Sequence, residues 1–213
     1  MTIAIMQATS QKDKNAILFN ATKNALKKLG RSDEVVNFGI FKDESENFSY
    51  IETAFLVSLL LSSRAVDFVI TGCSSGQGMM LALNSLPCVL CGYTPTPTDA
   101  YLFGKINGGN AVSLPLGLNF GWAGEINIEA TLEKLFDGDF ETGYPKEDAE
   151  RKLRDTKLLK SINSLTKKDA IISYSLYDKK LLRKAFRRKI VIDYILTNGK
   201  DEKIIDFIKH FGK

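Results

Sequence analysis

Residues 67–80 of this 213-residue chain read Asp-Phe-Val-Ile-Thr-Gly-Cys-Ser-Ser-Gly-Gln-Gly-Met-Met. The apolar, β-branched run at 67–71 is typical of a strand buried on both faces of a parallel sheet. The small residues from Gly72 to Gly78 predict a loop, and the apolar run after them predicts a helix. Such a strand–loop–helix unit is typical of α/β folds, in which ligands bind at the carboxyl ends of the strands.

The rest of the first 150 residues repeats this alternation of short strands and helices. We expect further strands at 2–6, 34–40, 87–91 and 111–114, and helices at 14–29, 50–63, 79–85 and 125–136. Residues 93–110 are rich in Thr, Pro and Gly and are interpreted as a polar loop. The pattern predicts an α/β fold, a Rossmann-like three-layer sandwich with a five-stranded parallel sheet and a helical C-terminal extension.

The charge of the chain changes sign near residue 150. Residues 1–150 contain 11 Lys or Arg against 18 Asp or Glu, a net charge of −7, and residues 151–213 contain 18 against 7, a net charge of +11. This shift predicts a Rossmann-like domain at 1–150 and a basic helical extension at 151–213. Helical patterns near 146–163, 167–189 and 200–211 fit the extension, which we expect to pack on the core or on a partner subunit.

The cysteines and the apolar runs indicate the cellular compartment. Cys88 and Cys91 lie in an apolar run in which a spacing of three points side chains to opposite faces of a strand, so we expect buried structural thiols. Three clustered cysteines form no disulfide framework, and with His210 as the single histidine no zinc ligand set can be completed. The start carries no signal-peptide pattern, and the apolar run at 53–61 is too short to span a bilayer. We expect a cytoplasmic protein.

The loop at 72–78 has the composition of an anion-binding loop. Small residues allow a ligand to approach the backbone N–H groups, and the N-terminus of the following helix adds partial positive charge. Neither a Walker A motif nor a dinucleotide-binding GxGxxG motif is present. A purely structural turn is the alternative interpretation of the loop.

Three segments of the chain resemble the type B ribose-5-phosphate isomerases and galactose-6-phosphate isomerases. Residues 73–84, Cys-Ser-Ser-Gly-Gln-Gly-Met-Met-Leu-Ala-Leu-Asn, are similar to the family segment Cys-Gly-Thr-Gly-x-Gly-x-x-x-Ala-x-Asn. Residues 107–114 are similar to its Asn-Asp-x-Asn-x-Leu stretch, and residues 136–143 to its Phe-Leu-x-x-x-Phe-Glu-Gly-Gly ending. The resemblance covers residues 1 to about 155, and with its extension the chain resembles a longer branch of the same superfamily.

The resemblance implies an intramolecular oxidoreductase, an aldose–ketose isomerase of a pentose or hexose phosphate that works through a cis-enediolate without metal or cofactor. Family members use a cysteine or a glutamate as the base; the glutamate position is Met79 here, so the resemblance assigns the base to Cys73. Ser75 and Asn107 complete the expected catalytic residues. The expected substrate-binding residues are Thr9, Ser10, Ser74, Gly76, Gln77, Gly78, Asn110, Lys146 and Arg151. The resemblance also implies a homodimer or a dimer of dimers with active sites at the subunit interface, and no membrane partner.

The chain departs from the family at the positions of several charged side chains. The family's Asp-His pair after the first strand is replaced here by Ala8-Thr9, and its ring-opening histidine is replaced by Ile106. The family's phosphate-binding His and Arg align with Pro145 and Asp148. The substrate would then be acyclic, open spontaneously, or be opened by another residue. The cations available for a phosphate are Lys12, Lys14, Lys146, Arg151 and Arg154.

Other roles stay open for some of these features. Asn107 and Asn110 suit turn caps as well as a ligand site. The basic run at 179–189 suggests a nucleic-acid-binding tail, although such runs more often pack an apolar stripe on a neighbouring element, which we favour. A catalytically diverged protein that binds or epimerises a sugar phosphate on the same scaffold is the other alternative.

Overall fold

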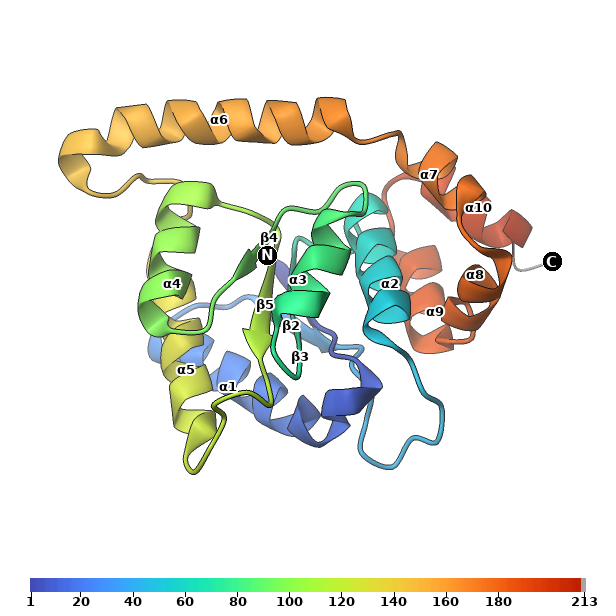
Figure 1. The fold of residues 1–213 in the computed structure, drawn as a ribbon, viewed down its shortest axis with the longest axis horizontal. Helices are drawn as coiled ribbons and strands as arrows, with labels where there is room; N and C mark the ends of the chain where they lie inside the picture. Colours follow the sequence, from blue (N-terminus) through green and yellow to red (C-terminus); the bar gives the residue numbers. More distant parts are fainter. Residues whose placement is uncertain (212–213) are drawn as a thin grey trace.

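A five-stranded parallel sheet forms the centre of the computed structural model, which describes residues 1–211. The strands are β1 (Thr2–Ile5), β2 (Glu34–Asn37), β3 (Phe68–Cys73), β4 (Cys91–Tyr93) and β5 (Ala111–Pro115). They pair in the order β2-β1-β3-β5-β4, and every pairing is parallel. The predicted α/β, Rossmann-like class and the five-stranded sheet are therefore confirmed (Figure 1).

Helices cover both faces of the sheet. Helices α1 (Asn15–Lys28), α4 (Pro97–Leu102) and α5 (Gly124–Leu135) cover one face, and α2 (Tyr50–Ser62) and α3 (Gln77–Asn84) cover the other. The strands alternate accordingly, since successive side chains of a strand point to opposite faces. Ile3 and Phe68 join the α1 and α5 cluster, whereas Ala4 and Val69 join the α2 cluster.

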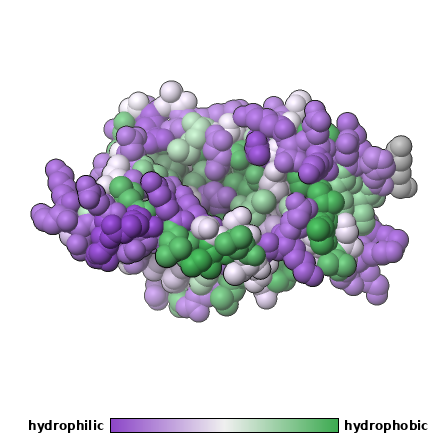
Figure 2. Space-filling view, turned by 90° about the horizontal axis from the view of Figure 1, so that it is seen from above, coloured by the Kyte–Doolittle hydropathy of each residue, from purple (hydrophilic) through white to green (hydrophobic). Residues whose placement is uncertain are grey.

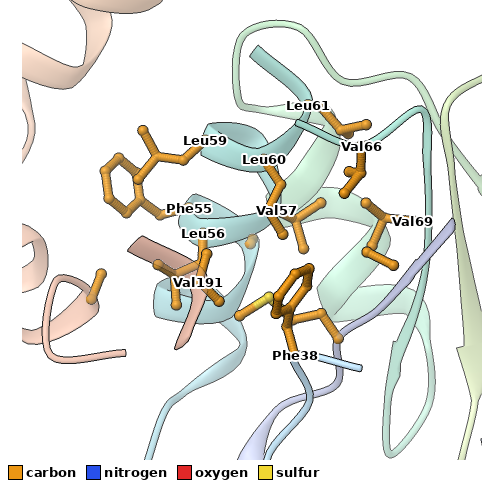
Figure 3. Close-up of a cluster of buried hydrophobic side chains, with 14 of the residues drawn as sticks. Phe38, Phe55, Leu56, Val57, Leu59, Leu60, Leu61, Val66, Val69 and Val191 are labelled. Atoms are coloured by element: carbon orange, nitrogen blue, oxygen red, sulfur yellow. The ribbon is translucent and has the colours of Figure 1, made fainter. Parts of the chain in front are cut away.

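Five helices follow the sheet domain. They are α6 (Ala149–Thr166), α7 (Ala170–Leu176), α8 (Lys179–Ala185), α9 (Lys189–Asn198) and α10 (Glu202–Phe211), preceded by the short 3-10 turn η3 (Lys146–Asp148). Helices α8 and α9 pack on α2; Figure 3 shows Val191 of α9 beside Leu56 of α2. Leu182 and Ala185 of the basic run are buried, so this run packs its apolar stripe on the core. The two-part division of the chain itself stays a prediction.

Helix α6 runs alone across one edge of the sheet domain (Figure 1). Of its 18 residues, Thr156 alone is buried, and Leu158 and Leu165 are 60% and 82% exposed. Figure 2, seen from the side of α6, shows hydrophobic residues gathered within a largely hydrophilic surface. Among residues 1–211, the helices all fall short of the length and apolar character needed to cross a membrane.

Three sequence expectations for secondary structure were wrong. The single helix expected at 167–189 is two helices, because Asp178 caps a new helix by accepting from the N–H groups of Lys180 and Leu181. The expected loop at 93–110 contains α4 and a π-helical turn η2 (Phe103–Asn107). The expected strand at 87–91 begins only at Cys91.

Of the two cysteines expected to be buried, Cys91 is buried and Cys88 is exposed. Cys91 is buried at the start of β4, and burial raises the pKa of its thiol. Cys88, by contrast, is exposed and has a positive φ of 62°, a backbone conformation that a regular strand does not contain. The two residues therefore do not share a strand, and the opposite-face argument does not apply to them.

Tyr174 allows a test of how the extension is attached to the sheet domain. Its ring is fully buried, and its hydroxyl lies 2.7 Å from Ser58 Oγ and 3.0 Å from Ser62 Oγ of α2. Tyr174→Phe removes these bonds while both serines keep a backbone acceptor. The free energy of unfolding should fall by about 1 kcal/mol in urea titrations. Tyr144→Phe, which removes a hydroxyl from a half-exposed ring, is the matched control; equal losses in both variants would contradict the prediction.

Candidate functional site

The loop that follows β3 lies at the carboxyl edge of the sheet, between β1 and β5. Cys73, the last residue of β3, pairs in register with Pro115 of β5. The carbonyl of Ser74 accepts from the N–H groups of Gly117, at 3.0 Å, and Leu118, at 2.7 Å. The loop is therefore attached to the segment after β5 as well as to its own strand.

Gly76 gives the loop its sharp turn into α3. It has a φ of +78°, and a Cβ there would lie 2.6 Å from the Tyr93 ring and 2.9 Å from the backbone of Leu114. The hydroxyl of Ser113 donates to the Gly76 carbonyl at 2.6 Å. The N-cap of α3 is Gly76, which has no side chain to cap the helix, so the first N–H groups of α3 have no partner from that residue's side chain.

Cys73 places a thiol at the carboxyl edge of the sheet. The residue is half-buried and its sulfur is free of any disulfide. The Cys73 sulfur and the Tyr50 ring both lie within 4 Å of the point that a Cβ on Gly78 would occupy, at 3.9 Å and 3.8 Å. The sulfur and the half-exposed aromatic ring therefore flank Gly78 on the α2 side of the loop.

Tyr50 was not identified from the sequence, although a signal was present. Ser49 and Glu52 form a capping box, in which each side chain accepts from the backbone N–H of the other. A helix that follows a parallel strand starts at the carboxyl edge of the sheet, so this cap places Tyr50 in the first turn at that edge.

The segment after β1 forms the other side of the loop. It is a 3-10 turn, η1 (Thr9–Lys14), from which Gln11 Nε2 donates to Ser74 Oγ at 2.9 Å. Thr9 Oγ1 accepts from Phe48 N at 2.7 Å, so its hydroxyl anchors the connection between β2 and α2. Ser10 is exposed at this edge.

Two lysine side chains lie near the same edge. The ammonium of Lys14 lies 3.8 Å from the centroid of the Phe120 ring, in the segment after β5. Lys12 Nζ lies 3.5 Å from the carbonyl oxygen of Glu44. Both follow β1, so the carboxyl edge has cationic groups of its own.

The structure therefore brings together part of the expected site. Thr9, Ser10, Cys73, Ser74, Ser75, Gly76, Gln77 and Gly78 lie at the carboxyl edge. Asn107 ends η2 and Asn110 directly precedes β5, so both lie at the amino edge of the sheet. The length of β5 separates the two groups by roughly 13 Å, at about 3.3 Å per residue.

Both polar atoms of the Asn110 side chain bond within the chain. Its Oδ1 accepts from Leu90 N at 2.8 Å, and its Nδ2 donates to the Cys88 carbonyl at 2.7 Å. These bonds fix the turn before β4 to the start of β5. This geometry favours the turn-capping role that we kept as an alternative for Asn110.

Lys146 and Arg151 also lie away from the Cys73 loop. Both are exposed, at the start of the α6 segment, and α6 is attached to η2 by a bond from Thr156 Oγ1 to the Ile106 carbonyl at 2.7 Å. The guanidinium of Arg151 pairs with Asp148 at 2.8 Å and Asp155 at 3.4 Å. In Figure 1, α6 lies at the top and the β3 and β5 ends point downward.

Two cavities flank the sheet, and Cys73 lines neither. The larger, of about 840 Å³, lies at the amino edge and includes Cys88, Asn110 and Lys167 in its lining. The smaller, of about 240 Å³, lies at the carboxyl edge, between Tyr93, Phe120 and α5. The half-buried Cys73 instead packs partly against the apolar cluster around α2. In the described part of the chain, His, Cys, Asp and Glu side chains form no group of three that could hold a metal ion.

Comparison with known proteins gives a consistent result. A family model described as Ribose/Galactose Isomerase matches residues 8–153. The crystal structure of a 4-deoxy-L-threo-5-hexosulose-uronate ketol-isomerase complexed with a tartrate is 38% identical, with a TM-score of 0.93 and 99% of each chain covered. A ribose-5-phosphate isomerase from Vibrio parahaemolyticus is 34% identical, with a TM-score of 0.92 and 99% of each chain covered.

A shorter protein matches the sheet domain less closely. The ribose 5-phosphate isomerase of Thermotoga maritima is 25% identical, with a TM-score of 0.54, and the alignment covers 73% of this chain and 96% of that one. The comparison with curated protein sequences gave no match. The helical extension is thus a feature that this chain shares with the two neighbours covered over 99% of their length.

Proposed function

Because this chain belongs to the ribose/galactose isomerase family, we propose that it interconverts the aldose and ketose forms of an open-chain sugar derivative, with Cys73 as the base. One observation carries the proposal: a half-buried, free thiol ends the central strand β3 beside the uncapped start of α3. Met79, at the position where other family members carry a glutamate, has no group that accepts a proton.

The reaction needs one base and one group that stabilises negative charge. The Cys73 thiolate removes the proton from the carbon next to the carbonyl, and the C–H electron pair forms the C=C bond of a cis-enediolate. The carbonyl electrons move to its oxygen, which the N–H groups of residues 74–78 stabilise as an oxyanion hole does. The Cys73 thiol then returns the proton to the former carbonyl carbon. The hydroxyl proton of the second oxygen passes to the first oxygen, so that the second becomes the new carbonyl, the first becomes a hydroxyl and the thiolate is regenerated.

The absence of an imidazole at this edge favours an acyclic substrate. The family's histidine positions hold Thr9 and Ile106, and the single histidine, His210, lies in α10 with its Nδ1 2.7 Å from the Asp206 carbonyl. A substrate that is already open needs no ring-opening acid. We therefore propose an open-chain keto sugar as the substrate.

The charged end of this substrate is a carboxylate in our proposal. The family's phosphate-binding His and Arg positions hold Pro145 and Asp148, and Asp148 pairs with Arg151. A dianionic phosphate needs several cations or donors, whereas a uronate carboxylate carries one charge. The similarity to a hexosulose-uronate ketol-isomerase supports this choice.

A sugar phosphate is the second candidate. The lysines Lys12 and Lys14 lie near the carboxyl edge and could bind a phosphate, and one neighbour of full length carries the name of a ribose-5-phosphate isomerase. We also expect a second copy of the chain to bring its Asn107, Lys146 and Arg151 to the Cys73 loop. Within one chain these residues lie away from that loop, toward the amino edge of the sheet. That dimer stays a prediction.

A substrate panel tests the proposal. Purified protein is assayed with an open-chain keto-uronate, ribose 5-phosphate and galactose 6-phosphate. We expect kcat/KM for the uronate to exceed that for either phosphate by about tenfold or more, because a site that binds one polar group discriminates against the other. Preferred turnover of a phosphate would support the second candidate, and isomerisation of none of the three would contradict the proposed function.

A further inference from the structure

Arg188 is the one charged residue among residues 1–211 that is buried as a whole residue, at 6% exposure. It lies between α8 and α9 of the extension, yet its guanidinium bonds to residues almost 150 positions earlier in the chain. Nε and Nη2 donate to the Phe38 carbonyl at 3.3 and 3.2 Å, and Nη2 donates to the Gly39 carbonyl at 2.6 Å. Nη1 and Nη2 also pair with the carboxylate of Glu44.

These bonds attach Arg188 to residues 38–48, the connection between β2 and α2, which we call the 38–48 loop. The segment has no strand or helix of its own to satisfy its carbonyls, and the planar fork of an arginine binds carbonyls and a carboxylate together. The Phe41 and Phe48 rings lie 6.0 and 5.8 Å from the guanidinium carbon. The extension thus provides one anchor of this loop, next to the bond from Gln7 Nε2 to the Ile40 carbonyl at 2.9 Å.

The 38–48 loop leads to two segments that contact the Cys73 loop, η1 and the start of α2. Phe48 exchanges two hydrogen bonds with Thr9, from Thr9 N to its carbonyl at 3.1 Å and from its N–H to Thr9 Oγ1 at 2.7 Å. Two residues after Thr9, Gln11 bonds to Ser74. Two residues after Phe48, the Tyr50 ring lies against Gly78, within 4 Å of the position of a Cβ there, as does the Cys73 sulfur.

We propose that Arg188 is a positioning residue for the active site: by anchoring the 38–48 loop it holds η1 against Ser74 and Tyr50 against Gly78, two residues of the Cys73 loop. The kinetic part of this proposal rests on the proposed function, whereas the effect on the exposure of Cys73 does not. The Cys73 loop has separate anchors in Ser113, Gly117 and Leu118. Loss of Arg188 therefore affects substrate binding more than the chemical step.

Arg188→Lys and Arg187→Lys form a matched pair of variants. Both keep the charge, but a lysine at 188 cannot bind two carbonyls and a carboxylate in one plane. Arg187 is 68% exposed and lies 3.8 Å from Glu46. We expect KM to rise about tenfold in Arg188→Lys with kcat reduced less than about threefold, because uniform binding is lost. Arg187→Lys should match the wild type in both constants.

Alkylation of Cys73 provides a readout that does not need turnover. In a Cys88→Ser background, iodoacetamide labelling of the Cys73 peptide is followed by mass spectrometry. We expect the labelling rate of Cys73 to rise about tenfold in Arg188→Lys, since local opening exposes the thiol, and to stay unchanged in Arg187→Lys. Wild-type KM and wild-type labelling in Arg188→Lys would overturn the proposal.

Glu44→Gln keeps the proposal testable if Arg188→Lys does not fold. This variant removes the carboxylate but leaves the bonds from Arg188 to the Phe38 and Gly39 carbonyls. Cys73 labelling should rise about threefold, and no change would overturn the proposal. Faster labelling in a protein that isomerises no sugar would support the positioning role and contradict the proposed function, so the two failures are distinguishable.

Discussion

Cys73→Ser should lower kcat by about a thousandfold, the contribution typical of a general base. Serine is nearly isosteric with cysteine, so the half-buried position at the end of β3 stays filled and the loop bonds of Ser74 and Gly76 are preserved. A serine hydroxyl is a far weaker proton acceptor at neutral pH than a thiolate. KM should change little, because the backbone donors of the loop are retained.

Cys88→Ser is the matched control for this prediction. Cys88 is exposed and lines the cavity at the opposite edge of the sheet. Its replacement should leave kcat within about twofold of the wild type, as expected for a residue that does not touch the reacting atoms. A Cys73→Ser enzyme with wild-type kcat would show that another group is the base.

Gly76→Ala should destabilise the protein by about 3 kcal/mol and abolish turnover. An alanine at the φ of +78° costs about 1–2 kcal/mol. Its Cβ would also lie 2.6 Å from the Tyr93 ring and 2.9 Å from the Leu114 backbone, an overlap that costs about 1–3 kcal/mol more. Relief of that overlap moves the loop away from Ser113 and displaces the N–H groups from the substrate.

Gly78→Ala is the control for stability, measured by urea unfolding. A Cβ at Gly78 would make ordinary contacts of 3.8 and 3.9 Å with Tyr50 and Cys73. Alanine is favoured over glycine within a helix by about 0.5–1 kcal/mol, so this variant should be at least as stable as the wild type. Equal stability of the Gly76→Ala and Gly78→Ala proteins would contradict the strained-turn account.

The sheet could be predicted where strong patterns coincide with buried positions. The β-branched run before Cys73 and the small residues after it correctly predicted the central strand and the turn into the next helix. The strand at Cys91 was placed too early, because the turn at Cys88 has a left-handed backbone that its apolar composition does not reveal. Helix α4 was missed although Thr96 and Asp99 form a capping box after which a helix is expected.

The tertiary contacts of the site could not be predicted from the sequence. Thr9 was expected at the substrate, and the structure shows its hydroxyl bonded to Phe48, which no local pattern indicates. Arg188 lies in a run of basic residues, five of which are at positions 183–189, and nothing in their order distinguishes the one that is buried. Its partners are the Phe38 and Gly39 carbonyls and Glu44, so its role follows from packing alone.

The fate of the substrate hydrogen in D2O tests the central claim most directly. Wild-type protein and Cys73→Ser are incubated with the preferred keto sugar, and the product is analysed by NMR. Proton transfer through an enediolate predicts solvent deuterium at the carbon that gains a proton in the wild type, and neither product nor exchange above the uncatalysed rate in Cys73→Ser. Isomerisation without any deuterium in the product, or exchange that persists in Cys73→Ser, would contradict the account.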